Sequence, residues 1–144
     1  MAGLVDLILQ EQGQPRRDMR FIKPLALAYL GDTVFDLYVR GKLVLWQEGG
    51  TKELHQQASS LVCAEAQARM MKQIMPLLSE EEKAVFVKAR NQKSLTVPKH
   101  ASLMDYKWAT GFEALLGYLF LENQQERLYE LMEKAVESEK EEAP

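Results

Sequence analysis

Apolar residues recur along most of this chain at the three- and four-residue spacing of an amphipathic helix, whereas the alternation expected of strands is weak. The commonest residue types also favour helices. The pattern therefore predicts an all-α fold of six or seven helices. The segments expected to be helical are about 3–11, 24–47, 52–75, 79–90, 103–122 and 124–139.

Several of these helix ends carry recognisable signals. Pro24 suits the first turn of a helix, because its missing N–H would have no partner there. Thr51 follows two glycines and suits an N-cap, while Ser79 and Glu82 form a capping-box pattern. Pro76 should stop the helix that precedes it.

No linker is long enough to separate two domains. We expect one main domain at residues 21–138, preceded by a helix and loop at 1–20 and followed by a frayed acidic tail at 139–144. The length of 144 residues and the apolar content of 47% suffice for one domain with a real core.

The net charge of −3 is unusual for a protein that binds nucleic acid. The C-terminal residues are rich in Glu, so any RNA-binding surface must be a local basic patch. The single cysteine, Cys63, excludes a disulfide within the chain, and its apolar neighbours predict a buried free thiol. The N-terminus lacks the basic region of a signal peptide and no apolar run could span a membrane, so we expect a cytoplasmic protein.

Two strongly apolar helical segments contain carboxylates. Residues 25–39 carry Asp32 and, one turn later, Asp36, while residues 108–121 carry one acid, Glu113. A buried ionised carboxylate costs several kcal/mol unless it is paired or binds a cation. Clustered oxygen ligands without His or Cys suit Mg²⁺ or Mn²⁺. Such a metal can activate water and stabilise an in-line displacement at phosphorus.

Three glycines in these segments predict close packing of helices. Gly31, Gly111 and Gly117 are unfavourable inside helices, so a close approach of another backbone would explain them. We expect the two segments to cross with Asp32 and Glu113 near each other. From the residues alone, buried ion pairs or N-capping acids remain an alternative explanation.

At these positions the chain resembles the ribonuclease III family. Residues 30–34 read Leu-Gly-Asp-Thr-Val, similar to the first signature of its catalytic domain, and residues 112–122 read Phe-Glu-Ala-Leu-Leu-Gly-Tyr-Leu-Phe-Leu-Glu, similar to the second. The resemblance extends over about residues 22–137. The Leu-Ala-Tyr-Leu-Gly-Asp order at 27–32 and the Arg-Asn-Gln-Lys-Ser loop at 90–94 look like the short subfamily, Mini-ribonuclease III. Only 31 residues follow Glu113, too few for a double-stranded-RNA-binding domain.

The resemblance implies a homodimeric helical fold with a metal site. Asp32 and Glu113 carry over as catalytic residues and ligands of Mg²⁺, for which Mn²⁺ can substitute. Two further acids of the standard enzymes are absent, since Ala28 and Thr110 occupy their positions, as in the short subfamily. Asp36 is a further candidate ligand, although a pair with Arg40 is its more ordinary explanation.

The most basic stretch of the chain lies between these two segments. A loop of this kind can place cations on phosphates and amides on 2′-hydroxyls of an RNA minor groove. The alternative is an ordinary solvated loop. The residues predicted to bind RNA are Lys88, Arg90, Asn91, Lys93, Ser94 and Lys99.

These features together predict an endoribonuclease that cuts double-stranded RNA and leaves 5′-phosphate and 3′-hydroxyl ends. The subfamily resemblance implies maturation of 23S ribosomal RNA ends, with the help of a large-subunit ribosomal protein. The apolar surface of residues 109–121 is more than a domain this small can easily bury alone, which favours a C2 dimer built on that helix. A non-catalytic helical dimer that binds structured RNA or the ribosome is the alternative, and an acidic protein-interaction module is a third.

Overall fold

The computed structural model describes residues 2–93, 99 and 102–142. This part of the chain is all-α, as expected, with two additional 3₁₀ turns, η1 (Met19–Phe21) and η2 (Met75–Leu77). The α-helices are α1 (Leu4–Leu9), α2 (Pro24–Trp46), α3 (Thr51–Val62), α4 (Ala64–Ile74), α5 (Glu80–Arg90), α6 (Leu103–Leu121) and α7 (Gln125–Glu142).

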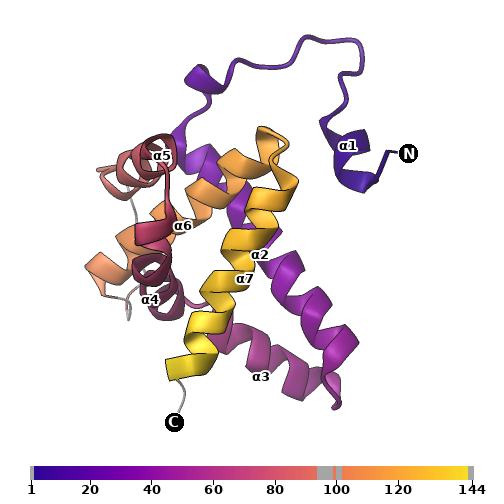
Figure 1. Cartoon of the computed structure of the whole chain (residues 1–144), viewed down its shortest axis with the longest axis vertical. Helices are drawn as coiled ribbons and strands as arrows, with labels where there is room; N and C mark the ends of the chain where they lie inside the picture. The colour runs from indigo at the N-terminus through magenta and orange to yellow at the C-terminus, as the bar shows by residue number, and fades with distance from the viewer. Residues whose placement is uncertain (1, 94–98, 100–101, 143–144) are drawn as a thin grey trace.

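Helix α6 is the centre of the fold. It packs against α2, α4, α5 and α7, which surround it (Figure 1). Most of its residues from Ala109 to Leu119 are buried within the single chain, including Phe112, Leu115 and Leu116. The expectation that residues 109–121 keep a surplus apolar face for a dimer was therefore wrong, because α2 and the other neighbouring helices already cover that face.

The exposed apolar surface lies instead on α2. Tyr29 is 82% exposed, Leu37 70% and Val44 68%. Phe35 and Val39, on the other side of the same helix, are buried in the core. The long apolar run of α2 thus divides between a core face and a face with no covering element in the described part of the chain.

The segment predicted as one helix at 52–75 is two helices. Cys63 has an extended backbone, with φ of −70° and ψ of 155°, and separates α3 from α4. Its amide N–H still bonds to Ser59, and its carbonyl accepts the N–H of Gln67, so the break leaves no orphaned backbone group there. Cys63 is exposed, which corrects the prediction of a buried thiol.

Other helix ends follow the sequence signals. Pro24 occupies the first turn of α2. Ser79 and Glu82 form a reciprocal capping box at the start of α5, with distances of 3.2 and 2.8 Å. Gly50, rather than Thr51, is the N-cap of α3. Helix α7 runs to Glu142, past its expected end at 139, and Glu139 bonds to Arg69 on α4 at 2.8 Å.

An ion pair holds α5 against the start of α7. The Glu82 carboxylate, which is buried, accepts two hydrogen bonds from Arg127 at 2.8 and 2.9 Å. Arg127 also donates to the carbonyl of Leu77. These bonds, with the cap at Ser79, hold the pKa of Glu82 below its usual value. This ion pair fixes the position of α5, whose C-terminal end leads into the basic loop.

The N-terminal segment extends away from the helical body (Figure 1). Helix α1 touches the α6–α7 turn through Asp6, which accepts hydrogen bonds from Asn123 and Gln125. Arg16 donates to the carbonyl of Leu121. Over the described residues, none of the helices has the length and apolar character needed to cross a membrane.

Candidate metal centre and RNA-facing surface

Asp32 and Glu113 meet where α2 crosses α6. Gly31 lies directly against the backbone of Glu113, so closely that a side chain at 31 would overlap the Glu113 carbonyl. Gly117, one turn further along α6, lies in the same way against the Leu27 carbonyl. Because the helices touch through two glycines, the carboxyl groups of Asp32 and Glu113 come within hydrogen-bonding reach. This confirms the predicted crossing, except that Gly111 packs against Phe86 of α5 instead of α2.

The surroundings of the Glu113 carboxyl disfavour its ionised form. Burial, followed by the hydrogen bond and the negative charge of Asp32, raises its pKa from 4.5 to about 9. The side chain of Gln67 on α4 opposes this shift. Asp32 itself is exposed. The pair therefore has one half-buried member and one that faces solvent, where a substrate can approach.

These residues suit a hard divalent cation. Ionising two adjacent carboxylates in a buried place is costly unless a cation binds between them. Without a cation, one of the two keeps a proton. Among the described residues, the groups that act on the Glu113 carboxyl are Asp32 and Gln67, and neither is a cation. The described chain has no group of three or more His, Cys, Asp or Glu placed to hold a metal. A metal here would have two protein carboxylates and keep several waters, as Mg²⁺ does.

Asp36 is not joined to this pair. Its carboxylate accepts a hydrogen bond from Arg40, one turn along α2, at 2.8 Å. The side chains of both residues are partly exposed. The structure thus agrees with the ordinary explanation of Asp36 as a helix ion pair.

The two positions that lack acids have other partners. Ala28 is buried in a small cluster with Leu27, Ala89 and Ala114. Thr110 is buried, and its hydroxyl donates to the carbonyl of Tyr106 at 2.9 Å. Neither position supplies an oxygen to the Asp32–Glu113 pair.

The predicted RNA-binding residues cluster at the C-terminal end of α5. Lys88 and Lys93 are exposed, as is Lys99 beyond the loop, and Arg90 donates to the side chain of Asn91 at 3.1 Å. Ser94 falls outside the described residues. The structure leaves Lys88 and Lys93 exposed to solvent at the C-terminal end of α5.

A cation that sequence reasoning missed joins this cluster. Lys72 of α4 lies over the ring of Trp108, at 5.5 Å from the centroid, and the Arg90 guanidinium lies 6.0 Å from the same ring. Phe86, 4.8 Å from Trp108, completes the aromatic support for Arg90. Nothing in the local sequence around Lys72 sets it apart, because only the fold brings α4 and α5 together at α6.

Gln67 was also missed, although the sequence carries a signal for it. Gln67 occupies an apolar helix face together with Met70, Met71 and Ile74, at spacings of three, four and seven residues. A lone amide in such a face is a polar group that the fold must bury. Its side chain is only 2% exposed.

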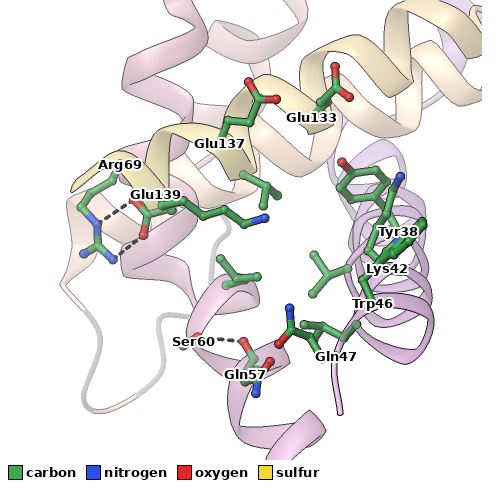
Figure 2. A pocket seen from close by; sticks show the side chains of 15 residues that line it. Tyr38, Lys42, Trp46, Gln47, Gln57, Ser60, Arg69, Glu133, Glu137 and Glu139 are labelled. Carbon is green, nitrogen blue, oxygen red and sulfur yellow. Dashed lines mark hydrogen bonds and ion pairs between the residues drawn. The ribbon is translucent and has the colours of Figure 1, made fainter. Parts of the chain in front are cut away.

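A pocket of about 900 Å³ lies away from the acidic pair and opens between α2, α3, α4 and α7. Figure 2 shows Tyr38, Lys42 and Trp46 on one side of it and the bonded pair Arg69–Glu139 on another. Neither Asp32 nor Glu113 lines it. The candidate metal centre is therefore a surface site at a helix crossing.

Known proteins resemble the chain over most of its length. The model of the Ribonuclease III domain matches residues 25–124. A Mini-ribonuclease 3 of Thermoanaerobacter sp. (strain X514) is 46% identical over 116 residues, which cover 81% of this chain and 82% of that relative. A Mini-ribonuclease 3 of Clostridium tetani (strain Massachusetts / E88) is 39% identical over 122 residues, with coverage of 84% and 81%. The crystal structure of a Fusobacterium nucleatum protein aligns with a TM-score of 0.76 at 30% identity, and covers 86% of this chain and 99% of that one.

Proposed function

Since the chain belongs to the Mini-ribonuclease 3 family of the ribonuclease III domain, we propose that it is a metal-dependent endoribonuclease that cleaves double-stranded RNA. The observation that carries the proposal is the meeting of Asp32 and Glu113 at the α2–α6 crossing. The test is incubation of the purified protein with a long RNA duplex and Mg²⁺. We expect duplex fragments with 5′-phosphate and 3′-hydroxyl ends, whereas an intact duplex that stays bound would contradict the proposal.

The two carboxylates have different parts in this mechanism. Glu113, fixed on the central helix and mostly buried, provides a rigid oxygen ligand. Asp32, on the solvent side, faces the incoming phosphodiester. A bound Mg²⁺ or Mn²⁺ would neutralise both charges and supply the Lewis acidity for an in-line displacement at phosphorus. Asp36 contributes in this proposal only by pairing with Arg40 beside the site.

We assign the RNA-facing role to the cations at the end of α5, with the loop beyond them. Lys88→Ala and Lys93→Ala should each weaken duplex binding and lower the slope of log affinity against log salt by about 1. Lys52→Ala, at an exposed position on α3, is the matched control and should change neither. Fluorescence anisotropy over a salt series, in Ca²⁺ or without metal, measures both quantities. An unchanged slope in both loop variants would exclude phosphate contacts there.

We also propose that the protein is a homodimer formed through α2. The exposed Tyr29 and Leu37 lie eight residues apart on one face of that helix, beside Asp32. A two-fold contact along this face would cover them and place two acidic pairs along one duplex. Leu37→Glu should therefore convert the dimer into a monomer, as sedimentation velocity can show. A wild-type protein that sediments as a monomer at micromolar concentration would contradict this part of the proposal.

The natural substrate in this proposal is the precursor of 23S ribosomal RNA, met in the cytoplasm with a large-subunit ribosomal protein bound. Loss of the gene should leave 23S RNA with extended ends. The alternative, a non-catalytic dimer that binds structured RNA, is favoured by the two positions without acids, Ala28 and Thr110, which have apolar or backbone partners instead. It predicts binding of the duplex without any cleavage.

A further inference from the structure

Gln67 is a buried amide with an unpaired oxygen. Its Nε2 donates to the carbonyl of Val62, near the end of α3, at 3.1 Å. Its Oε1 has no hydrogen-bond partner, and it is the only such buried side-chain atom among the described residues. A buried acceptor left unpaired costs about 1–3 kcal/mol. The neighbouring Met70 and Met71 show that a long apolar side chain fits on this face of α4.

The same amide lies beside the acidic pair. The Gln67 side chain opposes the upward shift of the Glu113 pKa, so its amide acts on that carboxyl and favours the charged form. An amide has two N–H groups, so one can serve Val62 while the other serves Glu113. The oxygen then remains without a partner. Helices α2, α4 and α6 each contribute one polar side chain here, Asp32, Gln67 and Glu113.

The geometry points to Gln67 as a positioning residue of the metal centre, which holds the Glu113 carboxylate with an N–H and accepts a hydrogen bond from the cation's hydration water with its Oε1. Amide oxygens suit the hydration shell of Mg²⁺, which keeps several waters. Gln67 would thus add a neutral oxygen to a site with only two acids. The inference rests on the proposed function, because it requires a cation between Asp32 and Glu113.

Gln67→Met tests this role by removing both the N–H and the oxygen while keeping the length of the side chain. We expect its affinity for Mn²⁺, measured by titration of the free protein without RNA, to fall by about 10- to 100-fold. Cleavage should then need a correspondingly higher Mg²⁺ concentration for half-maximal rate. Gln57→Met is the matched control, since Gln57 is a partly buried amide that lines the distant pocket (Figure 2), and it should bind Mn²⁺ like the wild type.

Gln67→Glu separates this role from a purely structural one. The Glu side chain keeps an oxygen beside the cation but cannot donate to the Val62 carbonyl. If Gln67 served only to make that hydrogen bond, Gln67→Glu and Gln67→Met would lose it equally. We expect Gln67→Glu to bind Mn²⁺ more tightly than Gln67→Met. Equal weakening in both variants, or wild-type affinity in Gln67→Met, would overturn the inference.

The same titration distinguishes this inference from the function on which it rests. If wild type binds Mn²⁺ no better than Asp32→Asn, the metal centre itself is wrong, and the role of Gln67 falls with it. If Asp32→Asn binds weakly but Gln67→Met binds like wild type, only the role of Gln67 is wrong.

Discussion

Asp32→Asn and Glu113→Gln should each slow the cleavage of double-stranded RNA by about 100- to 1000-fold, because each removes a charged oxygen that fixes positive charge at the scissile phosphate. The two residues act as one unit, so the double variant should be little worse than either single variant. Single-turnover cleavage at saturating enzyme measures the effect. Duplex binding should remain, since the RNA-facing cations lie on α5 and its loop. Cleavage at an undiminished rate in Asp32→Asn would exclude this pair as the catalytic centre.

The stability of the same variants gives an independent readout. Burial, and then the neighbouring Asp32, make ionisation of Glu113 unfavourable in the metal-free fold, where its pKa is about 9, compared with 4.5 for an unperturbed carboxyl. The folded state therefore retains a proton that the unfolded state loses, and the free energy of unfolding should fall as pH rises from about 4.5 to 9. Asp32→Asn removes the facing charge, so in EDTA its free energy of unfolding should fall less between about pH 5 and 8 than that of wild type. Thermal melts at several pH values in EDTA check this, and an equal or larger fall in Asp32→Asn would contradict it.

Gly31→Ala should lower the free energy of unfolding by about 3 kcal/mol or more, because the new methyl group would overlap the backbone carbonyl of Glu113. A backbone neighbour cannot rotate away as a side chain can, so α2 and α6 must move apart. The same movement would separate Asp32 from Glu113 and abolish cleavage. Denaturant unfolding and the cleavage assay together measure both consequences.

Gly41→Ala is the internal control for this prediction. Gly41 lies in the same helix, and a side chain there would meet no atom within 4 Å. Helix propensity alone then applies, and the variant should be more stable by up to about 1 kcal/mol, with normal cleavage. If Gly31→Ala behaves like Gly41→Ala, the close crossing of α2 and α6 is not a requirement of the site.

The central geometry could be predicted from sequence because its signals are local. Glycines inside apolar helices are unfavourable unless something approaches closely, and acids in the same runs need a partner. Gly31 and Gly117 meet the opposite backbone, and Asp32 meets Glu113, as these arguments require. The capping box at Ser79 also forms as its spacing indicates, because a cap depends on residues only three positions apart.

What the sequence did not reveal depends on contacts between distant segments. The break at Cys63 has no glycine or proline to mark it, and the extended backbone there comes from the packing of α3 and α4 on different neighbours. The burial of α6 within one chain depends on how many helices pack against it. The exposed apolar side chains are therefore on α2 and not on α6. Lys72 joins Arg90 at Trp108 for the same reason, since α4 and α5 both pack against α6.

The most direct test of the proposed metal centre is the anomalous difference map of a crystal grown with Mn²⁺. We predict a peak between the carboxylates of Asp32 and Glu113, with an oxygen of each bound to the metal and with water in the remaining positions. Peaks elsewhere on the protein, with none between these two carboxyl groups at the same Mn²⁺ concentration, would contradict the account.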